Sequence, residues 1–89
     1  MKRVEMMEKY YIGYRAGHTT AFSESDLYDV LRYLKLTNQD IFVYDETEEK
    51  PKMVLIYVNN RISFTKKMID NLPEILKLYE GCELGAPLE

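Results

Sequence analysis

Residues 53–64 read MVLIYVNNRISF, and this stretch decides the fold. Every position from Met53 to Val58 is apolar or aromatic, which is typical of a strand in the interior of a sheet. Asn59 and Asn60 follow, and asparagine tolerates the left-handed backbone that a two-residue hairpin turn requires. The stretch therefore predicts a tight hairpin with a second strand over residues 61–64.

A helical pattern follows the hairpin, although a proline interrupts it. Pro73 costs about 3 kcal/mol inside a helix but is tolerated in a first turn. With Asn71 as the N-cap and Glu74 at the third helical position, Pro73 falls at the second position, and residues 66–70 form a separate turn or extend the strand. A single helix from Lys66, bent at the proline, is the alternative. The apolar stripe has the spacing i, i+3, i+4, i+7 and comprises Leu72, Ile75, Leu76 and Tyr79.

The same plan occurs earlier in the chain, 42 residues upstream. Residues 11–36, YIGYRAGHTTAFSESDLYDVLRYLKL, align without a gap with residues 53–78, MVLIYVNNRISFTKKMIDNLPEILKL. Four identities over this length are scarcely above chance, and a solenoid normally needs three or more copies. The alignment therefore supports only a shared plan, in which a hairpin leads into a helix.

The upstream copy contains the clearest helix of the sequence. Ser23 is suited to an N-cap, Asp26 completes an approximate capping box, and Asn38 is suited to closing the helix. Gly17 supplies a turn between a strand at residues 9–15 and a short strand at 19–22. The buried stripe is expected to comprise Leu27, Val30, Leu31 and Leu34.

These elements, with a further strand at residues 41–44, predict an α+β fold. We expect a mainly antiparallel sheet of four or five strands with two helices on one face, in the order ββα-β-ββα. If the first hairpin is instead one bent strand, the order becomes that of a ferredoxin-like split βαβ fold. Residues 9–81 are expected to form a single domain. A flexible N-terminal segment (1–8) and a C-terminal tail (82–89), with tag residues at its end, would flank it.

Composition excludes several classes of function. The 89 residues carry a net charge of −3, one cysteine and one histidine. An acidic chain has no general attraction to nucleic acid or anionic membranes, and one cysteine forms no internal disulfide. Common zinc sites need four ligands drawn mostly from cysteine and histidine. We therefore expect a cytoplasmic protein with no metal, no cofactor and no membrane segment.

The stretch around His18 is the first place to look for catalysis or anion binding. A histidine acts as a general base when a carboxylate orients it, but no such spacing is visible, and a polar residue at an exposed turn is the simpler interpretation. The helix start after Ser23 has no Walker lysine, and Glu24 and Asp26 would repel a phosphate there. The acidic loop from Asp45 to Glu49 lacks the spacing of a calcium site.

Tyrosine content gives the strongest indication of function. Eight tyrosines occur in the chain, and two helices can cover only one face of the sheet, so the other face should expose aromatic side chains. The leading hypothesis is a small non-catalytic interaction or regulatory protein, of the kind found in bacteria and phages, that binds a protein partner or itself as a homodimer. The alternatives are a single-stranded nucleic-acid binder that uses the same face and a small-molecule enzyme centred on His18. The candidate interface comprises Tyr10, Tyr14, Tyr44 and Tyr57, and the candidate basic rim comprises Arg15, His18, Arg61, Lys66 and Lys67.

Overall fold

The computed structural model describes residues 10–15, 17–47 and 49–88, so the predicted N-terminal segment 1–8 lies outside the described residues. The described residues form six strands and three helices. The strands are β1 (Tyr10–Arg15), β2 (His18–Ser23), β3 (Ile41–Asp45), β4 (Lys52–Val58), β5 (Arg61–Phe64) and β6 (Glu83–Leu84). The helices are α1 (Glu24–Leu36), α2 (Lys66–Asn71) and α3 (Glu74–Leu78).

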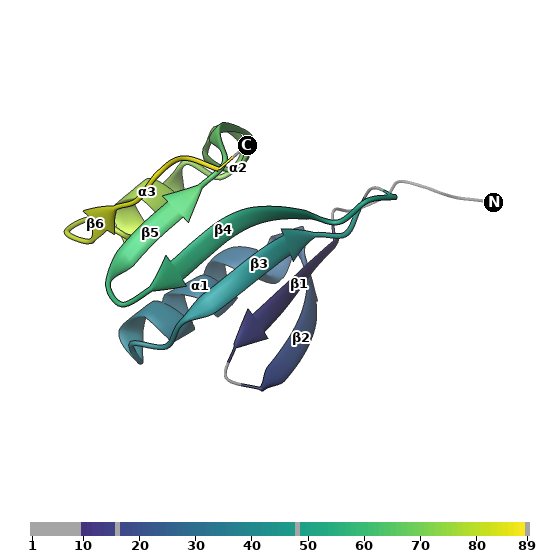
Figure 1. Cartoon of the computed structure of the whole chain (residues 1–89), viewed down its shortest axis with the longest axis horizontal. Helices are drawn as coiled ribbons and strands as arrows, with labels where there is room; N and C mark the ends of the chain where they lie inside the picture. The colour runs from purple at the N-terminus through teal and green to yellow at the C-terminus, as the bar shows by residue number, and fades with distance from the viewer. Residues whose placement is uncertain (1–9, 16, 48, 89) are drawn as a thin grey trace.

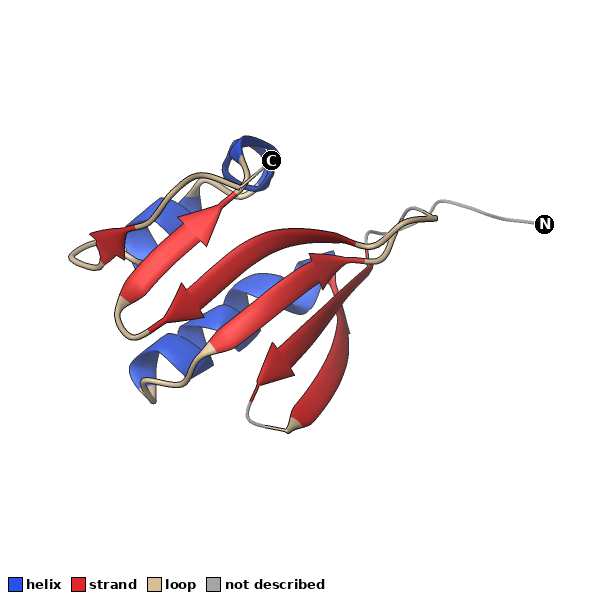
Figure 2. Cartoon of the chain, in the orientation of Figure 1, coloured by secondary structure: helices blue, strands red, loops and turns tan. Residues whose placement is uncertain are grey.

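One sheet contains all six strands, in the spatial order β2-β1-β3-β4-β5-β6. Every neighbouring pair is antiparallel except β5 and β6, which are parallel. Figure 1 shows α1 behind β3 and β4 and α3 behind β5, with the opposite face of the sheet free of helices. The α+β class and the mainly antiparallel sheet are therefore confirmed (Figure 2).

The predicted numbers of strands and helices were wrong. The sheet has six strands rather than four or five, and three helices rather than two follow its hairpins. The ferredoxin-like alternative is also wrong, because β1 and β2 are separate strands paired along their whole length, from Tyr10 with Ser23 to Arg15 with His18.

Helix α1 forms where its periodicity predicts it. Leu27, Leu31 and Leu34 are buried, and Val30 packs against the core. Asn38 lies just beyond the C-cap with a φ of 55°, as expected of a residue that closes a helix. Ser23 occupies the N-cap position, but its hydroxyl contacts the Ser25 hydroxyl at 2.9 Å instead of capping a backbone N–H.

The second hairpin also turns where the sequence predicts. Val58 pairs with Arg61, and the intervening Asn59 and Asn60 have φ values of 54° and 64°. Two consecutive residues with positive φ are the signature of the turn that matches the twist of paired strands. The hairpin ends at Thr65, whose side chain caps α2 by accepting from the Met68 N–H at 3.1 Å.

The helical segment after this hairpin is broken at Pro73. Leu72 has φ −134° and ψ 73°, which lies outside the helical region, as expected for a residue before proline. The bent single helix is therefore wrong, and so is the cap at Asn71, because Asn71 ends α2 and Pro73 itself is the N-cap of α3. The predicted stripe is partly correct: Ile75 and Tyr79 are buried, whereas Leu76 is 52% exposed.

A bulge in β4 sets which of its side chains are buried. Val43 pairs with Leu55, but the next residue, Tyr44, pairs with Met53, so Val54 is an extra residue in the ladder. Val54 and Leu55 are both buried as a result. The bulge also determines the faces of the residues that follow it in β4.

The C-terminal residues pair with the sheet instead of forming a free tail. Beyond α3, β6 runs parallel to β5, and the Gly85 N–H donates to the Ile62 carbonyl at 2.8 Å. Further along, the Leu88 N–H donates to the Phe64 carbonyl at 3.2 Å. The described part of the expected C-terminal tail, residues 82–88, therefore pairs with the edge of the sheet at β6, Gly85 and Leu88.

The hydrophobic core lies between the sheet and the helices. Leu27 and Leu31 from α1, Leu55 from β4 and Ile75 from α3 are completely buried in it. Across the described ranges, no helix combines the length and the apolarity needed to cross a bilayer.

Candidate functional site

The face of the sheet without helices carries a continuous set of apolar and aromatic side chains. Strand alternation places one residue in two on each face. In β1, Tyr11 and Gly13 are buried, whereas Tyr10, Ile12 and Tyr14 point to the opposite side. We call this opposite side the open face. It is formed chiefly by Tyr10, Ile12, Tyr14, Phe42, Tyr44, Met53 and Ile56.

Strand register aligns these residues in rows across the sheet. Tyr14 pairs with Phe42, and Phe42 pairs with Ile56. The neighbouring row joins Ile12 to Tyr44. Directly opposed side chains lie close enough to pack, so the rows form one apolar surface that spans three strands.

The aromatic rings of the open face are substantially exposed. Tyr10, Tyr14 and Phe42 expose 46%, 42% and 38% of their surface. The rings of Tyr14 and Tyr44 meet edge to face with centroids 5.3 Å apart, which fixes their orientation. Exposed aromatic rings on one face of a sheet are suited to contact with another apolar surface.

Tyr57 does not belong to the open face, which corrects the predicted interface. It is 2% exposed, lies on the helix side of the sheet and packs against Tyr79 with ring centroids 5.1 Å apart. Its hydroxyl lies 3.5 Å from the side-chain oxygen of Asn38, and burial raises its pKa. Tyr57 is therefore a core residue.

The predicted basic rim is dispersed over the molecule. Arg61 is on the open side of β5, but its guanidinium is paired with Glu83 at 2.9 Å. Arg15 bonds to the side chain of Gln39, and strands β3 and β4 separate its strand from that of Arg61. Arg15 and Arg61 therefore do not belong to one continuous rim.

The two lysines of the predicted rim lie at the other end of β5. Lys66 and Lys67 begin α2, after the last residue of that strand. Lys66 pairs with Asp70 at 3.2 Å, and Lys67 lines a pocket on the helix side of the sheet. The open face therefore has no basic border formed by these residues.

His18 is exposed at the first position of the edge strand β2. Within the described part of the chain, no hydrogen bond links it to a carboxylate that would orient it as a base. The same part of the chain contains no cluster of three or more histidine, cysteine, aspartate or glutamate side chains suited to a metal ion.

Sequence reasoning named Tyr10, Tyr14 and Tyr44 but missed Ile12, Phe42, Met53 and Ile56, which complete the open face. The alternation of Phe42 and Tyr44 along β3 is the signal that could have found Phe42. No equivalent signal exists for β4, because the bulge at Val54 interrupts its alternation.

Comparison with known proteins adds no assignment: no family model, curated protein or solved structure matches the chain.

Proposed function

We propose that the protein is a non-catalytic interaction module of the cytoplasm whose open face binds a protein surface, either a second copy of the chain or another protein. One observation carries the proposal: Tyr14, Phe42 and their neighbours form an exposed aromatic surface on the side of the sheet without helices.

Energetics favour a protein partner for such a surface. Burial of apolar area stabilises a complex by about 25 cal/mol for each Å² removed from water. Aromatic residues held in place by a sheet lose little conformational entropy on binding, and they are enriched at binding hot spots. Arg61 and Glu83 provide a polar boundary on the β5–β6 side of the same face.

Substitution of Phe42 by lysine tests the proposal. Phe42→Lys places a charge at the centre of the row formed by Tyr14, Phe42 and Ile56, and a buried unpaired charge opposes association. The matched control is Tyr33→Lys, which alters an aromatic residue on α1 that is 61% exposed, away from the open face. Sedimentation velocity over a concentration series measures self-association, and affinity capture at matched protein levels identifies another partner.

We expect the wild-type protein and Tyr33→Lys to associate and Phe42→Lys to lose association by about tenfold or more, which corresponds to about 1.4 kcal/mol. Self-association that disappears in Phe42→Lys assigns the face to a second copy. A wild-type protein that stays monomeric and captures the same proteins as Phe42→Lys contradicts the proposal.

Single-stranded nucleic acid is the second candidate ligand, because exposed rings on a sheet can stack on bases. Tyr10, Tyr14 and Phe42 supply the rings, but Arg61 is already paired with Glu83. A titration with short oligonucleotides at low salt decides between the two. Binding that weakens as salt increases and is lost in Phe42→Lys supports this candidate, and no binding at low salt removes it.

A further inference from the structure

Strand β2 forms one edge of the sheet, and no other described strand or helix lies along its outer side (Figure 1). Its first four residues, His18 to Ala21, are all exposed. On its inner side the strand pairs with β1 along all six of its residues without a shift in register, so no bulge turns the outer side away. β2 therefore presents a regular row of backbone groups to its surroundings.

The direction of these backbone groups follows from the neighbouring strands. In an antiparallel sheet, the N–H and C=O of one residue point to one neighbouring strand, and those of the next residue point to the other. The Tyr10 carbonyl accepts a hydrogen bond at 2.9 Å from the backbone of the residue after β3, so alternation directs Gly13 toward β2. Thr20 pairs with Gly13 and therefore bonds to β1. The N–H and C=O groups of Thr19 and Ala21, on either side of Thr20, consequently point outward.

A groove lies beside this edge, on the helix side of the sheet. Its volume is about 320 Å³, and it lies between β2 and α1. Thr20 and Phe22 line it from the strand, and Val30 and Tyr33 line it from the helix. The groove is present because α1 lies behind β3 and β4 instead of beneath the edge strand (Figure 1).

Apolar side chains make up most of the groove surface. Leu34 and Ile41 of the buried core contribute to it. The charged residues of the lining are Arg15 and Asp29, and the Arg15 guanidinium already bonds to the side chain of Gln39. A mainly apolar groove with few polar groups is typical of a site that binds an apolar group.

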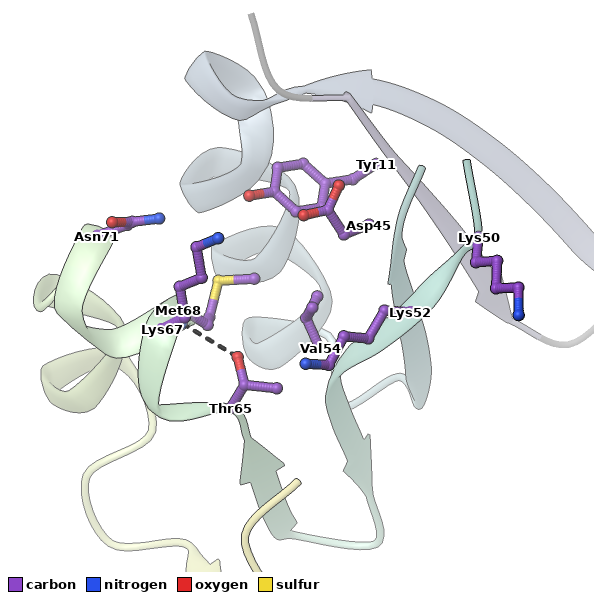
Figure 3. A pocket seen from close by; sticks show the side chains of 9 residues that line it. All are labelled: Tyr11, Asp45, Lys50, Lys52, Val54, Thr65, Lys67, Met68 and Asn71. Atoms are coloured by element: carbon purple, nitrogen blue, oxygen red, sulfur yellow. Dashed lines mark hydrogen bonds between the residues drawn. The ribbon is translucent and has the colours of Figure 1, made fainter. Parts of the chain in front are cut away.

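The pocket beside α2 differs in size, in chemistry and in access. Its volume is about 90 Å³, and Lys52, Lys67 and Asp45 contribute to its lining (Figure 3). The strands that border it, β1, β3 and β4, each have another strand on both sides. A side chain carried by an added strand can therefore reach the groove but not this pocket.

We propose that β2 and the groove together bind an extended peptide segment of another protein, with one large apolar side chain of that segment in the groove. The added strand runs antiparallel to β2 and forms hydrogen bonds with the backbones of Thr19 and Ala21. The ligand residue between these two positions lies opposite Thr20 and on the same face, so its side chain points toward the groove. In this mode of recognition, backbone hydrogen bonds supply affinity and the pocket for a side chain supplies specificity.

A second copy of the chain is less suited to this site. Its β2 would have to supply the side chain for the groove, and the residues on the helix side of β2 are His18, Thr20 and Phe22. Phe22 is 7% exposed and stacks on Tyr11 in the core of its own chain, so it is not free to enter a groove on another. His18 and Thr20 are polar. The apolar lining therefore favours a segment of a different protein.

Selection from a phage-displayed library of random heptapeptides tests the proposal with the full chain as the target. We expect the selected peptides to share one large apolar residue between β-branched residues. A synthetic peptide of the selected sequence is then added at saturation to the protein. Hydrogen exchange at the Thr19 and Ala21 amides should slow by about tenfold or more, whereas the Thr20 amide, already bonded to β1, should change less.

Two variants distinguish the edge from the groove. Ala21→Pro removes an outward N–H, which an edge strand tolerates, and Thr20→Trp fills the groove with a side chain of the protein itself. The matched control is Thr19→Trp, which adds the same bulk on the opposite face of the same strand. Ala21→Pro and Thr20→Trp should each weaken binding of the selected peptide by about tenfold, and Thr19→Trp should change it by less than about threefold.

The assignment is overturned if the library yields no peptide, or if Ala21→Pro and Thr20→Trp bind the selected peptide as tightly as the wild type. Self-association through β2, abolished by Ala21→Pro, would assign the edge to a second copy and would also overturn it. Phe42→Lys separates this site from the open face. Loss of peptide binding in Phe42→Lys alone places the peptide on the open face and overturns only the β2 site. Full binding by Phe42→Lys, with loss in Thr20→Trp, supports the β2 site whatever the open face binds.

Discussion

Two hairpins in this protein each lead into a helix, but the helices differ. After β1 and β2, α1 runs for 13 residues without a break. After β4 and β5, the helical segment divides into α2, with six residues, and α3, with five. Both first helices begin directly after a hydroxyl residue, Ser23 or Thr65, so the two units start alike and differ in how they continue.

The difference shows that the same order of hairpin and helix can bury core residues in two ways. The unbroken α1 lies behind β3 and β4 and buries three leucines. The break at Leu72 and Pro73 lets α2 and α3 point in different directions, so the second unit buries Met68 through one helix and Ile75 through the other. A small pocket lined by Tyr11 of β1 and by Lys67 and Met68 of α2 lies between the two units.

The largest predicted effect is on stability, when one core residue is truncated in each of the two hairpin–helix units. Leu31 in α1 and Ile75 in α3 are both 0% exposed and belong to one cluster. Leu31→Ala and Ile75→Ala should therefore each lower the free energy of unfolding by about 3 kcal/mol, measured by urea denaturation. Leu36→Ala, at a position that is 71% exposed, is the control and should change stability by less than about 0.5 kcal/mol.

If Ile75→Ala changed the free energy of unfolding only slightly while Leu31→Ala lowered it strongly, the second unit would contribute little to the cooperative core.

Tyr79 in the second unit should make the stability of the protein sensitive to alkaline pH. Burial raises the pKa of Tyr79 above its ordinary value of 10.0, so the hydroxyl stays protonated in the folded state while it ionises in the unfolded state. Its contribution to stability is therefore present below pH 10 and is lost as the pH rises toward the folded pKa. Stability should fall by about 1 kcal/mol for each pH unit above 10 on account of this residue.

Tyr79→Phe should remove that loss. The difference in unfolding free energy between the variant and the wild-type protein, measured by urea denaturation, should therefore increase above pH 10 in favour of the variant. At neutral pH the variant should be no less stable, because the Tyr79 hydroxyl is buried and lacks a hydrogen-bond partner among the described residues. Tyr33→Phe, at an exposed position, serves as the control. Parallel pH curves for Tyr79→Phe and the wild type would contradict this account.

The smallest predicted effect concerns the break itself. Pro73 has a φ of −62°, which suits proline, so Pro73→Ala should destabilise the protein by about 0.5–1 kcal/mol through greater freedom of the unfolded chain. Helical circular dichroism should stay unchanged if packing of Ile75 and Met68 holds the two helices apart. Lys77→Ala, at an exposed position of α3, controls for the helix propensity of alanine. A gain in both helicity and stability would show that the proline alone divides the helix.

Sequence alone predicted the features that depend on nearby residues. The leucines of α1 follow the helical period, and Asn59 and Asn60 make their turn with their own backbone preferences. The N-cap position of Ser23 is local in the same sense, although its hydroxyl caps no backbone N–H, whereas the cap at Thr65 was not predicted.

Features that depend on distant residues were not predictable in this way. Tyr57 was assigned to the wrong face because every residue from 53 to 58 is apolar or aromatic, so the pattern does not distinguish the two faces of β4. The bulge at Val54 sets these faces, and it arises from pairing with β3. The hydrogen bond from the Gly85 N–H to the Ile62 carbonyl joins two segments that are far apart in the chain. No pattern in either segment predicts that they pair. The pocket likewise unites Tyr11 and Lys67, which are far apart in the chain.

The two edge strands of the sheet, β2 and β6, differ in how well they can pair with a further strand. At one edge, β6 has only two residues, with Glu83 in an ion pair and Pro87 soon after, and such edges resist further pairing. At the other, β2 presents six residues of backbone, HTTAFS, with no proline and no acidic or lysine side chain. β2 is therefore better suited than β6 to pairing with a strand from another chain. If a second copy added edge to edge at β2, the assembly would stop at two chains, because each blocked β6 edge would terminate it before it became a fibre.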